Sequence, residues 1–119
     1  MIEPVTVKRF EKPDEMRDMQ RGRFEIVRMK DAVVGRATYQ PGWKWSLHVG
    51  PGVGAPLCTV EHVGLVLAGK AAVAFEDGTV VELHPGDLFH VPSRPHDSWV
   101  VGDEEYVSLH FLGADHYAR

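Results

Sequence analysis

The feature that most constrains the fold is a series of short apolar runs separated by residues that favour turns. About nine such runs follow Gly22, at residues 24–29, 33–39, 43–49, 59–67, 71–75, 79–83, 88–91, 98–101 and 106–112. Glycine, proline and aspartate lie between them, as is typical of consecutive β-strands. Between the runs there is no helical pattern of roughly 10–15 residues that would connect parallel strands. The sequence therefore predicts an all-β sandwich or barrel.

The strongest local signal is a hairpin at Glu76-Asp77-Gly78-Thr79, which joins two apolar alternating runs.

The N-terminal part of the chain lacks this pattern of short apolar runs. Residues 13–20 predict a short helix, because Pro13 lies at its start, acidic residues follow in the first turn and Gly22 acts as a stop. We therefore divide the chain into an N-terminal arm with a short helix (1–22), one β-barrel domain (23–113) and a C-terminal tail (114–119).

Charge and cysteine content exclude several classes of function. The net charge is −4 and no basic cluster is longer than Lys8-Arg9, so the chain is not suited to binding nucleic acid. No apolar run approaches the roughly 20 residues that cross a bilayer, so we expect no membrane partner. With 119 residues the chain has the material for one domain. Cys58 is the only cysteine, which excludes an internal disulfide and favours a reducing, cytoplasmic location.

Two stretches resemble motifs of a known family. Residues 85–92 (PGDLFHVP), followed by Pro95 and His96, are similar to the second motif of the cupins, in which a turn and a strand lead to a pocket histidine. The segment PGWKWS at residues 41–46 is similar to a subgroup of small bacterial cupins. The resemblance extends from about residue 13 to residue 112. It implies a cupin-type antiparallel β-barrel, or jelly roll.

The first cupin motif, G-x5-H-x-H-x3/4-E-x6-G, can be aligned in two ways. In one alignment the segment from Gly50 to Gly69 keeps every spacing, and Pro56, Cys58 and His62 stand at the three ligand positions. In the other, Gly42 and His48 open the motif, and an insertion displaces the rest. The sequence leaves both alignments open.

The resemblance implies a pocket in which His48, Cys58, His62 and His96 hold a divalent metal ion. Imidazole and thiolate ligands favour Zn²⁺, and Fe²⁺, Ni²⁺ and Cu²⁺ also fit them. In a regular strand Cys58 and His62 would lie roughly 13 Å apart, so the chain must bend between them if both bind one ion. Cys58 could otherwise be a reactive thiol or a core residue. Trp45 and His110 are the candidate substrate-binding residues.

These observations lead to two functional hypotheses. The first is a protein that binds a divalent transition metal and a small metabolite, as an oxygenase or an isomerase-like enzyme does. The second is a metal-free module that binds or senses a small molecule, because all three ligand positions of the first motif are changed. The sequence leaves open whether the chain is an enzyme. In many cupins an N-terminal strand joins the sheet of a partner subunit, so the resemblance also implies a homodimer.

Overall fold

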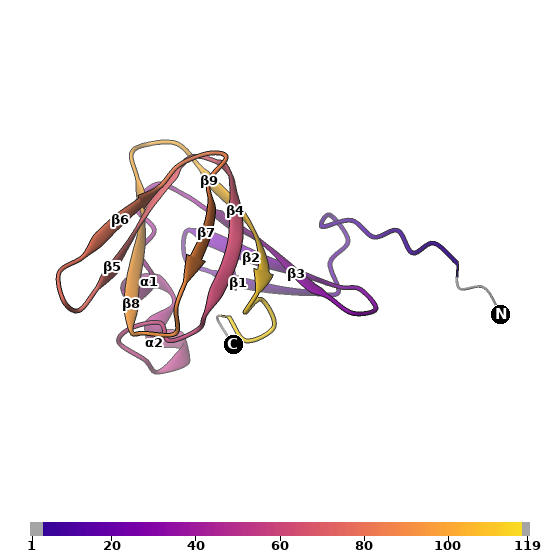
Figure 1. Ribbon diagram of the computed structural model, residues 1–119, viewed down its shortest axis with the longest axis horizontal. Helices are drawn as coiled ribbons and strands as arrows, with labels where there is room; N and C mark the ends of the chain where they lie inside the picture. Colours follow the sequence, from indigo (N-terminus) through magenta and orange to yellow (C-terminus); the bar gives the residue numbers. More distant parts are fainter. Residues whose placement is uncertain (1–3, 118–119) are drawn as a thin grey trace.

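The structure, a computed structural model, describes residues 4–117, and most of its regular structure is β-strand (Figure 1). Two helices of four residues each, α1 (Trp45–His48) and α2 (Gly50–Val53), lie between the third and fourth strands. Neither helix in this part of the chain is long and apolar enough to cross a membrane. The strands are β1 (Glu15–Met19), β2 (Gly22–Arg28), β3 (Val33–Tyr39), β4 (His62–Ala68), β5 (Lys70–Phe75), β6 (Val80–Leu83), β7 (Leu88–Val91), β8 (His96–Val101) and β9 (Tyr106–Leu112).

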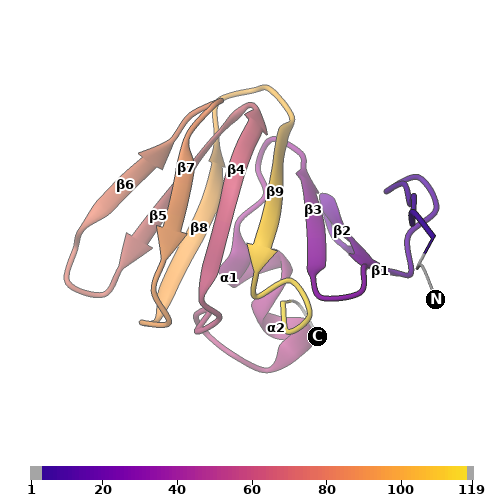
Figure 2. The ribbon, with the colours of Figure 1, turned by 45° about the vertical axis from the view of Figure 1, so that its right-hand side comes forward.

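The strands form two antiparallel sheets that share one core (Figure 2). The larger sheet has the order β1-β2-β3-β9-β4-β7, and the smaller has the order β6-β5-β8. Phe24 and Val66 enter the core from the larger sheet, and Val73 and Val100 enter it from the smaller one. The predicted all-β, antiparallel architecture is therefore confirmed.

Alternation along two neighbouring central strands directs polar side chains into the interior. Successive side chains of a strand point to opposite faces of the sheet. In β4 the buried positions include His62 and Val66, and in β9 they are Tyr106, Ser108 and His110. Because β4 pairs with β9, the two strands bring two histidines to the same side of the sheet.

The predicted hairpin is present between β5 and β6. Asp77 accepts a hydrogen bond from the backbone N–H of Thr79 at 2.9 Å, and Gly78 has a φ of 91°, in the region that favours glycine. A similar turn precedes β7, where the Asp87 carboxylate accepts a hydrogen bond from the backbone N–H of His84 at 2.8 Å. Both turns depend on residues close in sequence, which is why the sequence predicts them.

The predicted N-terminal helix is wrong, because residues 15–19 form strand β1. This strand pairs with β2 over its whole length, from Glu15 opposite Ile26 to Met19 opposite Gly22. Its side chains alternate between half-buried and exposed. Pairing with β2 thus outweighs the helix-start signals at Pro13, because intrinsic propensity is a weak preference that tertiary contacts override.

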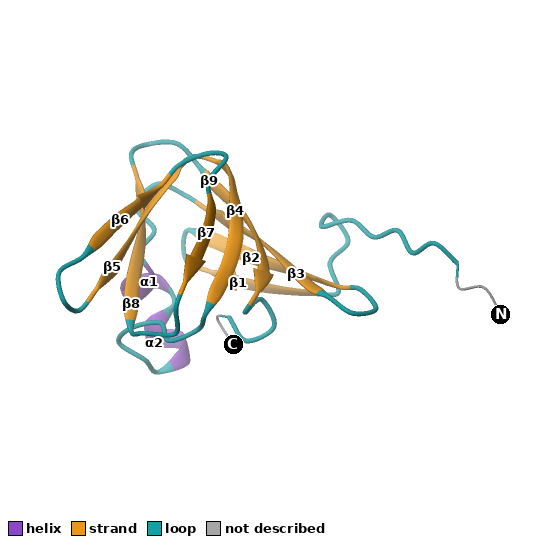
Figure 3. Ribbon diagram, in the orientation of Figure 1, coloured by secondary structure: helices purple, strands orange, loops and turns teal. Residues whose placement is uncertain are grey.

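The predicted strand at residues 43–49 is also wrong, because helix α1 lies there (Figure 3). The backbone N–H and hydroxyl of Ser46 donate to the carboxylate of Asp97 in β8, at 3.0 and 2.7 Å. Asp97 therefore satisfies a donor at the start of α1 from across the fold. Such a long-range contact leaves no local signal in the sequence.

Candidate metal centre and cavity

Cys58 and His96 lie directly opposite each other in an isolated antiparallel bridge. The N–H of Cys58 donates to the carbonyl of His96 at 2.9 Å, and the N–H of His96 donates to the carbonyl of Cys58 at 3.0 Å. Residues directly opposite in an antiparallel pair have their side chains on the same face. This backbone pairing therefore places a thiol beside an imidazole in the interior.

The chain bends between Cys58 and His62, as a shared ion requires. Strand β4 begins only at His62, and the residues between form no regular strand. The Cys58 Sγ and His62 Nε2 atoms are 3.7 Å apart. In a tetrahedral zinc site, with bonds of about 2.3 Å to sulfur and about 2.0 Å to nitrogen, these ligand atoms lie roughly 3.6 Å apart. The observed spacing fits two ligands of one ion.

His96 completes the group. One potential ligand atom from each of Cys58, His62 and His96 lies within 4.8 Å of the other two, and all three residues are buried. The His96 Nδ1 atom is 2.8 Å from the carbonyl oxygen of Arg94. Since a carbonyl only accepts, Nδ1 carries the proton and Nε2 keeps the lone pair that a metal needs. The donor set and its arrangement fit a divalent transition metal.

Burial keeps the three groups uncharged in the absence of an ion. Burial, with smaller effects of neighbouring His110 and His96, lowers the pKa of His62 to about 2, and burial also lowers the pKa of His96. Burial raises the pKa of the Cys58 thiol to about 11. Neutral imidazoles are the ligand form of histidine, whereas the thiol must lose its proton when it binds.

The three residues line a cavity of about 50 Å³ between the two sheets. A single water needs roughly 10–15 Å³ measured this way, so the cavity holds only a few water-sized groups. Its described wall contains no aspartate, glutamate, lysine or arginine. The lining residues are Tyr39, Trp43, Trp45, Cys58, His62, Ala71, Val73, Leu83, Phe89, Val91, His96, Ser98, Tyr106, His110 and Tyr117.

His110, a predicted substrate-binding residue, lies in this wall from β9. Its Nε2 atom is 2.9 Å from the hydroxyl of Ser108, and its ring is 5.4 Å from that of His62 between centroids. Burial lowers the pKa of His110 to about 4, so it is neutral at physiological pH. Its ring stacks near Tyr117, with centroids 6.2 Å apart.

Trp45, the other predicted substrate-binding residue, also lines the cavity, but from helix α1 rather than from a strand. The contact between Ser46 and Asp97 holds this helix beside β8, which carries His96. Asp97 therefore connects helix α1, which carries Trp45, to strand β8, which carries the candidate ligand His96. Its neighbour His96 points into the cavity, and Asp97 itself is half-buried.

The structure does not bring His48 to the group. His48 ends helix α1, and its Nδ1 accepts a hydrogen bond from the backbone N–H of Lys44 at 3.0 Å. Helical turning at residues 45–48 carries the side chain away from the cavity wall. Of the two alignments of the first motif, the one that uses Cys58 and His62 supplies two of the three members of the group, and its Pro56 is exposed.

Tyr117 is a lining residue that the sequence did not single out. It lies in the segment predicted as a tail, yet it is only 4% exposed, and its hydroxyl is 2.8 Å from that of Tyr39. Gly113, with a φ of 86°, lets the chain turn back after β9 where a side chain would meet the carbonyl of Glu61. No spacing or motif in residues 113–117 predicts that this segment returns to the cavity wall.

The chain is similar in structure to a Rhizobium leguminosarum protein of unknown function, with 17% identity, TM-score 0.59, and coverage of 91% of this chain and 97% of that one. A cupin-like protein of Thermotoga maritima gives 16% identity, TM-score 0.55, and coverage of 80% and 70%. Oxalate decarboxylase of Lactobacillus farciminis, in a formate complex, gives 20% identity and TM-score 0.63, with 95% of this chain but 35% of that one covered.

These likenesses, at low identity, show the fold. No curated protein matches the chain. The family model of the cupin domain matches residues 35–112, which include Cys58, His62, His96 and His110. That match extends from β3 to the end of β9 and so contains both sheets and the cavity between them. The chain belongs to the cupin family.

Proposed function

We propose that this cupin binds one divalent transition metal ion through Cys58, His62 and His96, with an open coordination position that receives a small metabolite. The observation that carries this proposal is the group of three ligand atoms within 4.8 Å of one another in the cavity wall. Catalytic metal sites commonly have three protein ligands and an open position, whereas structural zinc sites have four ligands. A bound ion would polarise an oxygen atom of the metabolite, which suits an oxygenase or an isomerase-like enzyme.

The ligand types favour particular metals and a particular compartment. One thiolate with two imidazoles suits Zn²⁺, and Fe²⁺, Ni²⁺ and Cu²⁺ are the alternatives. Zn²⁺ would favour isomerase-like chemistry because it has no redox chemistry, whereas Fe²⁺ would favour an oxygenase. Cys58 must stay reduced to bind any of them, which fits the cytoplasm.

The second candidate function is metal-free binding or sensing of a small molecule. It is favoured by the changed ligand positions of the first cupin motif, where Pro56, Cys58 and His62 stand. The mostly apolar and aromatic wall of the cavity also suits an uncharged ligand. The two candidate functions differ in whether Cys58 is needed as a metal ligand.

Metal analysis of the purified protein separates them. We expect about one equivalent of a transition metal after purification without chelator, and a thiolate-to-cobalt absorption band when Co²⁺ is added. Cys58→Ser should abolish the band, and His96→Gln should weaken Co²⁺ binding by more than about 100-fold. His90→Gln is the matched control, because His90 is exposed and contacts Glu61 at 2.7 Å.

The proposal is wrong if the protein holds less than about a tenth of an equivalent and gains none from added Zn²⁺, Fe²⁺ or Ni²⁺. Circular dichroism of each variant shows whether a loss of binding reflects unfolding. Equal Co²⁺ affinity of the His96→Gln and His90→Gln proteins would also contradict it.

A further inference from the structure

The buried polar atoms that lack a partner gather around one cavity. Within residues 4–117, the buried side-chain nitrogen and oxygen atoms without a hydrogen bond are Nε1 of Trp43, Nε1 of Trp45, Nδ1 of His62 and Nδ1 of His110. All four residues line the cavity described above. In folded proteins the large majority of buried polar side-chain atoms have a partner. An occupant of this cavity would supply partners to those of the four atoms that face it.

The two indoles specify what the occupant must offer. An indole N–H only donates, so it needs an acceptor. Trp43 and Trp45 are 2% and 3% exposed, so bulk solvent does not supply that acceptor. The Trp43 ring is stacked on Tyr39, with centroids 3.8 Å apart and planes 2° apart. The Cζ3 edge of Trp45 packs against Gly50, so its opposite edge carries Nε1. Both donors are therefore on well-packed rings.

Charge balance restricts the occupant further. The cavity wall contributes no formally charged lysine, arginine, aspartate or glutamate side chain. The Asp97 carboxylate interacts electrostatically with Cys58 and His96 from outside this wall, and Lys44, with Nζ 3.8 Å from Asp97 Oδ2, is its own counter-ion. A divalent ion on one thiolate and two neutral imidazoles leaves one net positive charge. A buried charge without a counter-charge is costly, because the interior has a low dielectric constant. An occupant with a single negative charge removes that cost.

Size sets the last limit. The cavity volume of about 50 Å³ corresponds to roughly four water-sized groups, part of which the metal ion would take. The occupant is therefore a molecule of a few non-hydrogen atoms, or one that pushes the aromatic wall outward. Because both Nε1 atoms are buried, the indole rings must shift when an acceptor reaches them.

We propose that the natural ligand is a small monocarboxylate whose oxygen atoms accept hydrogen bonds from the indole N–H groups of Trp43 and Trp45 and reach the open position of the metal. This inference rests on the proposed function, since the positive charge comes from the ion. It adds Trp43 to Trp45, which the sequence already predicted as a substrate-binding residue, and names carboxylates as the substrate class.

The test compares acetate with acetamide, which has the same shape but no charge. Each is titrated into the Co²⁺-loaded protein in a buffer without other carboxylates, and the cobalt absorption bands and tryptophan fluorescence are followed. We expect acetate to change both signals, and acetamide to bind at least about tenfold more weakly. Trp45→Phe and Trp43→Phe should each weaken acetate binding by about tenfold, the loss of one charge-assisted hydrogen bond.

Trp99→Phe is the control, because Trp99 is half-buried in β8 outside the cavity wall, where it contacts Lys44. Equal binding of acetate and acetamide would overturn the inference, and so would full acetate affinity in both indole variants. If Trp43→Phe does not fold, the comparison of the two ligands on the unchanged protein still decides. A cobalt spectrum that acetate leaves unaltered contradicts this inference alone, whereas failure to bind Co²⁺ contradicts the proposed function and the inference with it.

Discussion

The histidines of the cavity are kept neutral by burial rather than by hydrogen-bond partners. His110 is 7% exposed, and its Nδ1 has no partner among the described residues, while Nε2 contacts only Ser108. Burial lowers its pKa to about 4, compared with about 6.5 for an exposed histidine. The unfolded chain therefore binds a proton at this residue in a pH range where the folded protein does not.

This difference makes the metal-free protein less stable in acid. A lowered folded pKa means that the contribution of His110 is fully present above about pH 6.5 and is lost as the pH falls from there towards 4. The free energy of unfolding should fall by roughly 1 kcal/mol per pH unit for each such histidine. Urea unfolding between pH 4 and 8 measures this slope, and His110→Phe should reduce it. An unchanged slope in that variant would show that His110 is not the cause.

Single residues show why only part of the site could be predicted. Cys58, His62 and His96 stand at motif-like positions, so the family resemblance identified them. His48 belongs to a second alignment, which needs an insertion, and the structure places it at the end of helix α1, outside the cavity wall. No motif or spacing predicts that Tyr117 lines the cavity, because its position depends on the turn that follows β9.

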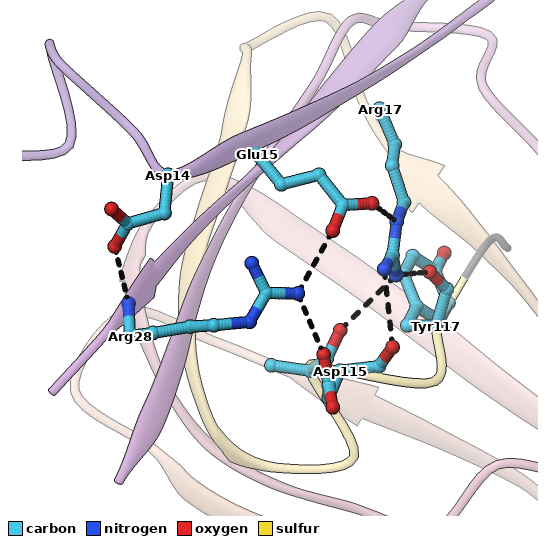
Figure 4. A network of polar contacts seen from close by, with 7 residues as sticks. Asp14, Glu15, Arg17, Arg28, Asp115 and Tyr117 are labelled. Carbon is cyan, nitrogen blue, oxygen red and sulfur yellow. Dashed lines mark hydrogen bonds and ion pairs between the residues drawn. The ribbon is translucent and has the colours of Figure 1, made fainter. Parts of the chain in front are cut away.

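At the scale of elements, strands β1 and β2 hold the C-terminal segment in place (Figure 4). The Arg17 guanidinium donates to three backbone carbonyls in residues 114–117, and its side chain is 9% exposed. Arg28 contacts both Glu15 at 2.9 Å and Asp115 at 2.8 Å. The segment that carries Tyr117 is therefore fixed by residues about a hundred positions earlier in the sequence.

Removal of the Arg17 side chain should loosen this segment. Arg17→Ala leaves three carbonyls without a donor, and we expect a loss of about 1–3 kcal/mol in the free energy of unfolding. Amide hydrogen exchange in residues 113–117 should accelerate more than in β4 or β9. Arg9→Ala serves as the control, since the Arg9 side chain is exposed and forms its ion pair with Glu11, near the N-terminus. Equal stability of the two variants would rule out this role for Arg17.

Elements set by local chemistry were predictable, and those set by distant contacts were not. The β5–β6 hairpin follows from Asp77 and Gly78, which form the turn by themselves. Strand β1 carries the start signals of a helix, but its pairing with β2 and the reach of Arg17 to the C-terminal segment decide its conformation. Helix α1 likewise depends on Asp97, about fifty residues away.

At the scale of the whole molecule, two features bear on the expected homodimer. Residues 4–9 extend away from the sheets, with Val5 and Val7 91% and 83% exposed (Figure 1). Leu88 of β7 and Phe111 of β9 are 76% and 48% exposed on the larger sheet. Strands β7 and β9 flank β4 in the larger sheet. Exposed apolar patches are typical of surfaces that bind another protein.

We propose that these surfaces join two copies of the chain, and light scattering after gel filtration tests this. The unchanged protein should have the mass of a dimer at micromolar concentration. Substitution of Val5 and Val7 together by serine should raise the dissociation constant by about tenfold or more, because two apolar contacts are lost. Leu47→Ser, which changes an exposed residue of α1, should have no effect. A monomeric unchanged protein would disprove the dimer.

The position of Cys58 has a practical consequence for experiments on this protein. It is the only thiol in the chain, it is 2% exposed, and it lines the cavity. Because the thiol is buried, a thiol reagent reacts only when the structure around Cys58 opens, so the rate of labelling measures how often this region opens. No engineered probe is needed, and the rate of Cys58 labelling can be compared with and without an added ion or carboxylate.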